Sequence, residues 1–353
     1  MNTSSPTIRS IQYVRGIAAL MVVWHHARHQ VPGLDEWFPT FFSAFGATGV
    51  DLFFVVSGFI MAITTRQSEG GPIDFMIRRL VRVVPLYWFL TLLMVAFALA
   101  QPALFKTVVI GPDALIKSLF FIPHYSTGIP DSIRPLLVPG WTLNYEMFFY
   151  LVLALCLFLP RVHRPVAVPA VMALLVGANI AFGPFTDAIA ISCTNPLLLE
   201  FALGFVIGEL HATKRIDIPA HLALFFVLAG LVILQTCREL PGAPYLPFAG
   251  AGLVIVGVLR VPFGNLPNRG LKLLGDASYS IYLTHIFTLG ILRVVWVRLD
   301  VLQPSFEAAG LWMSLSLACC SAAGILCYWW IEKPLGVAAS RWMRSHRIVA
   351  SPG

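Results

Sequence analysis

The sequence predicts an all-α protein: a polytopic integral membrane bundle of about ten transmembrane helices, with both termini in the cytoplasm. Hydrophobic residues make up 58% of the 353 residues and charged residues only 12%, whereas a soluble domain usually carries about 25% charged residues. The mean hydropathy is +0.80. A soluble core cannot bury this much apolar surface, so we expect the chain to cross a lipid bilayer many times.

Ten apolar segments justify the helix count, because each is near the ~20 residues that a tilted transmembrane helix needs. The segments span residues 11–30, 41–63, 83–104, 140–160, 165–183, 194–211, 219–237, 242–260, 272–297 and 309–331. With the N-terminus placed in the cytoplasm, 17 of the 24 lysines and arginines fall on the cytoplasmic side. This excess follows the positive-inside rule and supports an even number of helices.

We expect a single membrane domain over residues 1–335 and a basic cytoplasmic tail over residues 336–353. No small-residue cleavage site closely follows the first apolar segment, so a retained helix is predicted there rather than a signal peptide. Residues 113–123 predict an amphipathic helix near the outer surface. The net charge of +7 suits loops that fix topology, so no nucleic-acid partner is expected. The six cysteines lack a metal-type spacing, and no metal site is predicted.

Three arginines stand at the cytoplasmic start of the third segment, in "FMIRRLVRVVPLYWF". Arg78 and Arg82 are four residues apart and Arg79 and Arg82 three apart, so each pair shares a helix face. One interpretation is a topology anchor whose side chains reach the lipid headgroups. The other is an anion clamp, since arginine binds phosphate in a bidentate way, and a phosphate-bearing cosubstrate would suit it.

The first segment, "YVRGIAALMVVWHHARH", places Arg15 and His26 on one helix face. Eleven residues at 100° per residue end about 20° from three full turns, and the rise is about 16 Å. A charge and an ionisable ring on one intramembrane face suggest a functional site. Histidine is also the usual general base near neutral pH. The alternative is that His25, His26 and His29 only cap the helix at the outer interface.

Two carboxylates interrupt other apolar segments. Asp51 in "GATGVDLFFVVSGFIMA" has no adjacent cation and is expected to need an arginine or histidine from another helix. Glu146 lies five residues after Trp141 in "PGWTLNYEMFFY", in the predicted outer half of the membrane. Either carboxylate is a candidate to orient His26, and Glu146 is also a candidate to bind a sugar hydroxyl.

The ninth segment, "LGDASYSIYLTHIF", places Ser278, Tyr282 and His285 on one helix face at spacings of four and three. Packing with internal hydrogen bonds explains this pattern without any catalytic role. A supporting role in a substrate pocket is the functional alternative. At the end of the last segment, "YWWIEKPL" brings Glu332 and Lys333 to the cytoplasmic border.

Together these residues resemble the membrane acyltransferase-3 family, and most of all its bacterial exopolysaccharide O-acetyltransferases. The resemblance lies in "IQYVRGIAALMVVWHH" (11–26), "GVDLFFVVSGFIM" (49–61), "FMIRRLVRVVPLYW" (75–88), "PGWTLNYEMFFY" (139–150), "LGDASYSIYLTH" (274–285) and "IEKP" (331–334). These pieces occur in the expected order from end to end. One departure is that Met147 follows Glu146 where family members often carry a second acid.

The resemblance implies ten helices and transfer of an acyl group from cytoplasmic acyl-coenzyme A to an acceptor. It implies that His26 is the essential histidine and that Arg15, Arg79 and Arg82 serve activity or donor handling; with Arg78, these are the expected donor-binding residues. Trp141, Tyr150, Tyr282 and His285 are the expected acceptor-binding residues. Acetyl-coenzyme A would be the donor, with no permanently bound cofactor, and a glycan or lipid-linked saccharide the acceptor. The bacterial inner membrane would be the location.

The expected mechanism has His26 either deprotonating the acceptor hydroxyl or carrying the acyl group as a covalent relay, with Glu146 or Asp51 orienting its ring. The residues alone leave both routes open. They also leave open a transporter or flippase for a lipid-linked glycan, because intramembrane charges suit that class as well. A third alternative is an intramembrane serine protease that uses Ser57 and His285.

Overall fold

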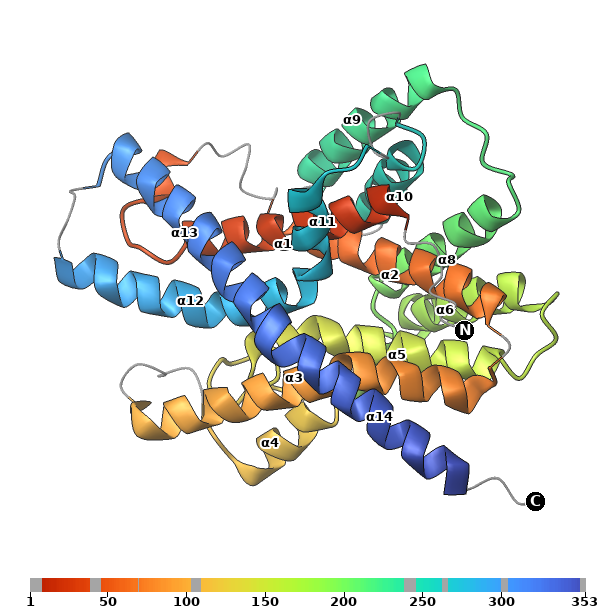
Figure 1. Ribbon diagram of the computed structural model, residues 1–353, viewed down its shortest axis with the longest axis horizontal. Helices are drawn as coiled ribbons and strands as arrows, with labels where there is room; N and C mark the ends of the chain where they lie inside the picture. Colours follow the sequence, from red (N-terminus) through yellow and green to blue (C-terminus); the bar gives the residue numbers. More distant parts are fainter. Residues whose placement is uncertain are drawn as a thin grey trace.

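The described part of the chain folds into helices (Figure 1). The computed structural model describes residues 8–38, 46–68, 70–102, 109–237, 246–261, 266–299 and 304–349. Its helices, in chain order, are α1 (Arg9–Arg28), η1 (Asp35–Trp37), α2 (Thr48–Gln67), α3 (Pro72–Ala100), α4 (Pro112–Leu119), η4 (Val138–Gly140), α5 (Trp141–Cys156), α6 (Arg164–Phe182), α7 (Ala188–Cys193), α8 (Leu198–Ala212), α9 (Ala220–Cys237), α10 (Leu246–Val258), α11 (Arg269–Asp276), α12 (Ser278–Leu299), α13 (Phe306–Cys327), η6 (Tyr328–Glu332) and α14 (Lys333–Val349).

The all-α membrane architecture predicted from the sequence is confirmed. Six helical stretches of the described residues are long and apolar enough to cross a bilayer. They are Thr48–Gln67, Pro72–Ala100, Arg164–Phe182, Ala188–Ala212, Ser278–Leu299 and Phe306–Met343. The other four predicted segments also contain helices, α1, α5, α9 and α10. Residues 41–45 and 242–245 of the second and eighth predicted segments lie outside the described residues.

Three differences from the predicted segments concern the arginines of the third segment, the ninth segment and the C-terminal tail. Helix α3 begins at Pro72, where proline suits the first helical turn because its missing N–H is not needed there. Arg78, Arg79 and Arg82 therefore lie within α3 and not before it. The ninth segment is two helices, since α11 ends at Asp276 and α12 begins at Ser278. The last segment continues through the π-helical turn η6 into α14, so the predicted tail is helical as far as Val349.

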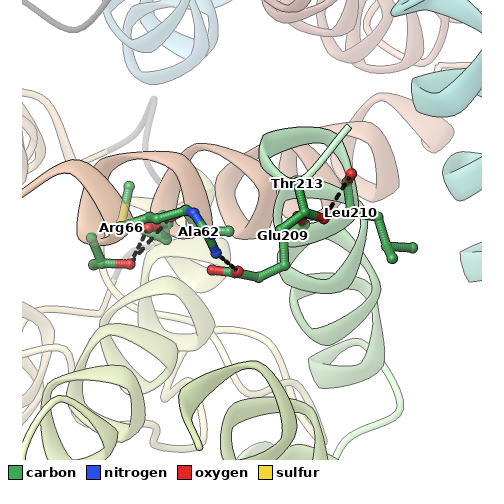
Figure 2. Close-up of polar contacts among 7 residues, drawn as sticks. Ala62, Arg66, Glu209, Leu210 and Thr213 are labelled. Carbon is green, nitrogen blue, oxygen red and sulfur yellow. Dashed lines mark hydrogen bonds and ion pairs between the residues drawn. The ribbon is translucent and has the colours of Figure 1, made fainter. Parts of the chain in front are cut away.

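Helix α2 packs against α8 with almost no side-chain layer between the two backbones. A Cβ atom added at Gly204 would lie 1.9 Å from the carbonyl oxygen of Val55, and one added at Gly58 would lie 2.1 Å from that of Phe201. Glycine at both positions allows this approach, as it does in membrane helix pairs. At the C-terminal ends of the two helices Arg66 donates to Glu209 across 2.8 Å (Figure 2).

Helix α1 contacts helices from both halves of the chain. Its neighbours include α2, α11, α12 and α13. In Figure 1 α12 and α13 lie on the left and α9 and α10 at the top, while α3, α4 and α5 form the lower part. The indole N–H of Trp312 on α13 donates to the carbonyl of Ala27 across 2.9 Å. The fold therefore places both ends of α1 against helices that come from the second half of the chain.

Candidate active site

A cavity of about 160 Å³ lies between α1, α2, α3, α5 and α12. Apolar side chains from α2, such as Phe53 and Ile60, form much of its wall. The lining residues with polar groups are Arg15, Ser57, Arg79, Arg82, Thr142, Glu146, Tyr150, Ser278, Tyr279 and Tyr282. The structure thus brings together residues from five helices that are far apart in the sequence, and six of the predicted site residues are among them.

Glu146 is the carboxylate of this cavity. Its Oε1 atom accepts a hydrogen bond from the Ser57 hydroxyl across 3.0 Å. The same oxygen accepts a second hydrogen bond from the hydroxyl of Tyr150, one turn further along α5. Glu146 therefore joins α5 to α2. Among the described residues its hydrogen bonds are to these two hydroxyls and not to His26, so the predicted contact between the carboxylate and the histidine is not formed.

The three arginines of α3 are divided between two spaces. Arg79 and Arg82 line the cavity, whereas the Arg78 guanidinium donates to the Ser68 hydroxyl across 3.1 Å and lines an outer groove. Arg82 pairs with the buried carboxylate of Glu332 across 2.6 Å, and it lines both the cavity and the groove. The Nε atom of Arg79 is buried and has no hydrogen-bond partner among the described residues. The predicted three-arginine clamp is therefore an inner pair and an outer single residue.

Helix α12 forms one wall of the cavity. Ser278 and Tyr282, predicted to share a helix face, both line it. The Tyr282 hydroxyl is 2.9 Å from that of Thr142 and donates to the carbonyl of Pro139 across 3.0 Å. These contacts tie α12 to the start of α5. Tyr282 is therefore held at both ends, by its own helix and by the turn that precedes α5.

His26 stacks on His285. The two imidazole rings are nearly parallel, with an interplanar angle of 5° and centroids 4.9 Å apart. His285 is fully buried, and its Nδ1 atom lies 2.5 Å from the carbonyl oxygen of Tyr282. A carbonyl only accepts hydrogen bonds, so Nδ1 of His285 carries a proton and donates it to this contact. The histidine pair lies one turn along α12 from the cavity wall.

Other predicted site residues lie outside the cavity lining. Asp51 is buried in the first turn of α2, where the helix dipole stabilises a negative charge. Trp141 packs edge-on against Tyr145, with ring centroids 5.9 Å apart. Ser57 donates to Glu146, and the imidazole of His285 lies against His26. The Ser57–His285 pair that a serine protease would need is therefore not formed.

Sequence reasoning did not assign a partner to Glu332. The Glu332 carboxylate accepts from Arg82 and from the Ser280 hydroxyl, each across 2.6 Å. The signal available in the sequence was a carboxylate beside the apolar run "YWWI", because such a group needs a cation or several donors. Among the described residues no group of three or more His, Cys, Asp or Glu side chains is arranged to hold a metal ion.

The arrangement defines a class of protein. Three guanidinium groups and one carboxylate line the cavity, so it suits an anionic ligand. A stacked histidine pair, one helical turn along α12 from a residue that lines the cavity, suits proton transfer or nucleophilic attack. Both features lie among helices that cross a membrane, which is the character of a membrane-embedded transferase.

The comparisons with known proteins name that class. Residues 8–331 match the acyltransferase domain family, so the chain belongs to the acyltransferase-3 family and is a multi-pass membrane acyltransferase. It is 38% identical to the exopolysaccharide production protein ExoZ of Rhizobium meliloti, over 82% of this chain and 89% of that protein. It is 26% identical to the acyltransferase MdmB of Streptomyces mycarofaciens, over 79% of this chain and 78% of that protein.

The name of a third relative states the reaction that it catalyses. The chain is 23% identical to the peptidoglycan O-acetyltransferase OatA of Listeria monocytogenes, over 93% of this chain and 56% of that protein. No solved structure matches the chain.

Proposed function

We propose that the protein is a membrane O-acyltransferase of the bacterial inner membrane. It moves an acetyl or other short acyl group from cytoplasmic acyl-coenzyme A to a hydroxyl of a cell-surface or exported polysaccharide precursor. The observation that carries the proposal is the cavity itself, which gathers Arg15, Arg79 and Arg82 and is also lined by Tyr282, one helical turn along α12 from the His285 ring that stacks on His26. The arginines suit the phosphates of coenzyme A, and the histidine suits the acceptor hydroxyl.

An open groove of about 500 Å³ between α3 and α14 supports a donor route from the cytoplasm. Arg78 and Lys333 line this groove, and Arg82 belongs to both the groove and the inner cavity. The adenosine end of the donor would lie in the groove, its diphosphate would pass Arg82 to reach the inner arginines, and its thin pantetheine arm would continue into the cavity. The Arg82–Glu332 ion pair stands at this junction, so its opening would admit the arm.

The proposed reaction at His26 transfers an acyl group from a thioester to a hydroxyl. The imidazole removes the proton of the acceptor hydroxyl while the oxygen attacks the thioester carbonyl carbon. The carbon–sulfur bond then breaks, and the thiolate of coenzyme A takes the proton from the imidazolium. In the covalent variant the imidazole nitrogen first attacks the thioester carbon and expels the thiolate of coenzyme A. The hydroxyl oxygen then attacks the acyl-histidine, the carbon–nitrogen bond breaks, and the hydroxyl proton passes to the thiolate.

A polysaccharide acceptor is favoured by the relatives. The name of ExoZ concerns exopolysaccharide production, and that of OatA concerns O-acetylation of peptidoglycan. Exopolysaccharides and peptidoglycan are both glycans and carry hydroxyl groups. The name of MdmB states only that it is an acyltransferase. A small-molecule acceptor is the second candidate, and it would use the same histidine and the same donor site.

The test uses membranes that contain the wild type, His26→Ala or His29→Ala. Acetyl-coenzyme A labelled on the acetyl group is added with the polysaccharide precursors of the host, and label is followed into glycan and into protein. We expect label in glycan with the wild type, and a loss of about 100-fold or more with His26→Ala, as for removal of a general base. His29 is exposed and serves as the matched control.

The outcomes separate the candidates. Label in glycan with the wild type and with His29→Ala, but not with His26→Ala, supports the proposal. Label that accumulates in the protein before it reaches glycan selects the covalent route. Equal transfer by all three proteins would remove His26 from the mechanism. If the wild type consumes no acetyl-coenzyme A with any acceptor, the donor assignment is wrong.

A further inference from the structure

A chain of hydrogen bonds leads from Arg15 in the cavity wall to the short helix α11. The Nη1 atom of Arg15 donates to Oε1 of Gln12 across 3.2 Å. The amide nitrogen of Gln12 donates in turn to Oδ1 of Asp276 across 2.7 Å. Gln12 is buried, and neither Gln12 nor Asp276 lines the cavity. The two residues thus form a second layer behind the arginine.

The carboxylate decides which way the Gln12 amide points. An ionised aspartate only accepts hydrogen bonds, so Gln12 must turn its NH₂ group towards Asp276. This orientation leaves the amide oxygen for Arg15, which only donates. The other carboxylate oxygen of Asp276 accepts from Lys272 across 2.6 Å, an arrangement that suits an ionised aspartate. Donor and acceptor alternate along the whole chain.

Backbone packing between α1 and α11 fixes the relative positions of the residues that form these hydrogen bonds. A Cβ atom added at Gly275 would lie 2.1 Å from the carbonyl oxygen of Gln12, so α11 and α1 are in direct backbone contact. The Tyr13 hydroxyl donates to the carbonyl of Leu266 across 2.7 Å and accepts from the N–H of Asn268 across 2.9 Å. The position of Asp276 relative to α1 is therefore fixed by packing and not by the side chains that use it.

We propose that Gln12 and Asp276 are positioning residues that aim the Arg15 guanidinium at the anionic donor. Arginine has many rotamers, and a free guanidinium in this cavity could pair with the carboxylate of Glu146. The hydrogen bond to Gln12 holds one edge of the guanidinium and leaves its other donors for a ligand. This inference rests on the proposed function for the identity of that ligand, and on the two hydrogen bonds of Gln12 for the positioning itself.

The test exchanges donor and acceptor along the chain. Asp276→Asn can present an NH₂ group to Gln12. The Gln12 amide can then flip and turn its own NH₂ group towards Arg15, which only donates, so the hydrogen bond between them is lost. Gln12→Glu sets two carboxylates against each other. The double variant Gln12→Glu/Asp276→Asn restores the alternation, because the new amide donates to the new carboxylate and the carboxylate accepts from Arg15. A merely structural role for either residue does not predict this rescue.

We expect each single variant to raise the KM for acetyl-coenzyme A about tenfold, with a smaller change in kcat, since a hydrogen bond to a charged group is lost. The double variant should return KM to within about threefold of the wild type. Lys272→Gln is the control, because it removes the exposed cation on Asp276 and leaves the amide orientation intact. Thermal unfolding of the purified protein in detergent is measured for all variants.

Several results would overturn the proposal. A double variant no better than the worse single variant would contradict the alternation of donors and acceptors. Single variants with wild-type KM, or an effect of Lys272→Gln equal to that of Asp276→Asn, would contradict the positioning of Arg15. If the wild type transfers no acetyl group, the proposed function fails. In that case the Tm values still test the hydrogen-bond chain from Arg15 through Gln12 to Asp276, and recovery of Tm in the double variant would support it.

Discussion

The two sides of α2 have opposite characters. On the side that faces α8, Gly58 and Gly204 bring the two backbones into contact and leave no room for a side chain. On the side that faces α3, α5 and α12, larger side chains such as Phe53 and Ile60 stand around a cavity that contains the Ser57–Glu146 hydrogen bond. Helix α2 therefore makes a close backbone contact with α8 at Gly58 and Gly204, which we call the seam, and forms a wall of the cavity on its other side.

One side of α2 is therefore expected to stabilise the fold, and the other side to serve the acyl transfer reaction. The seam has small residues and backbone contact, which is how membrane helices associate when no hydrophobic driving force acts between them. The cavity has arginines and a carboxylate, which are costly in a membrane and are therefore expected to have a function. Changes on the seam should alter folding, and changes on the cavity side should alter transfer while folding is kept.

The largest effect is expected from breaking the seam. Gly204→Val places a branched side chain where a Cβ atom already lies 1.9 Å from the Val55 carbonyl oxygen. We expect a loss of at least ~3 kcal/mol of stability, at the upper end for overpacking, because backbone must move. The yield of monodisperse protein in detergent and its Tm measure this. Gly177→Val is the control, since a Cβ atom there meets nothing within 4 Å; equal losses in both variants would contradict the seam.

The second-largest effect is expected at Arg79 in the cavity, in contrast to Arg78 in the outer groove. Arg79→Ala should lower kcat/KM for acetyl-coenzyme A about 30-fold, because a charge-assisted contact with the donor is lost. Arg78→Ala should lower it only about threefold, since its side chain lies in the outer groove and donates to Ser68. Both proteins should keep the wild-type Tm. A larger loss for Arg78→Ala than for Arg79→Ala would reverse the assignment.

A smaller effect is expected at the carboxylate of the cavity. Glu146→Gln keeps an oxygen that accepts from Ser57 or Tyr150 but removes the negative charge among the arginines. We expect kcat to fall about tenfold, in the range of one hydrogen bond to a charged group. Ser57→Ala removes only one neutral donor and should change kcat less than about threefold. Transfer that is insensitive to Glu146→Gln would leave this carboxylate a structural role only.

The smallest effect is expected at the far end of the seam. The Arg66–Glu209 pair lies at the C-terminal ends of α2 and α8, and the Arg66 side chain is 47% exposed (Figure 2). Such pairs contribute ~0–1 kcal/mol. Arg66→Met should therefore shift Tm by no more than about 3 °C and leave transfer unchanged. A large loss of stability would show that the ion pair, and not the glycine contact, holds the seam together.

Features within one helix could be predicted from the sequence. The shared face of Ser278, Tyr282 and His285 follows from the helical period, and the structure places two of them in the cavity wall and the third against His26. The membrane class follows from composition and is confirmed. The catalytic and binding roles of His26 and the arginines stay predictions, which the experiments above address.

Contacts between helices could not be predicted, because they depend on packing. Arg82 and Glu332 are 250 residues apart, and Gln12 and Asp276 are 264 apart. Neither pair has a signal in the local pattern of either residue. The separation of Arg78 from Arg79 was also hidden, since adjacent residues differ by 100° on a helix and only the positions of α12 and α14 decide which space each one enters.

The most direct test of the account asks whether the acyl donor occupies the cavity. A single cysteine is introduced as Ile60→Cys, on the cavity wall, or as Glu36→Cys, on the exposed surface, after the six native cysteines have been replaced. Alkylation by a maleimide is followed with acetyl-coenzyme A and with S-acetylpantetheine, which lacks the phosphates.

At ten times its Kd, acetyl-coenzyme A should slow alkylation at position 60 about tenfold, because about one site in eleven remains free. It should have no effect at position 36, and S-acetylpantetheine at the same concentration should protect neither position. Equal alkylation at position 60 with and without acetyl-coenzyme A would contradict the central claim that this cavity is the donor site.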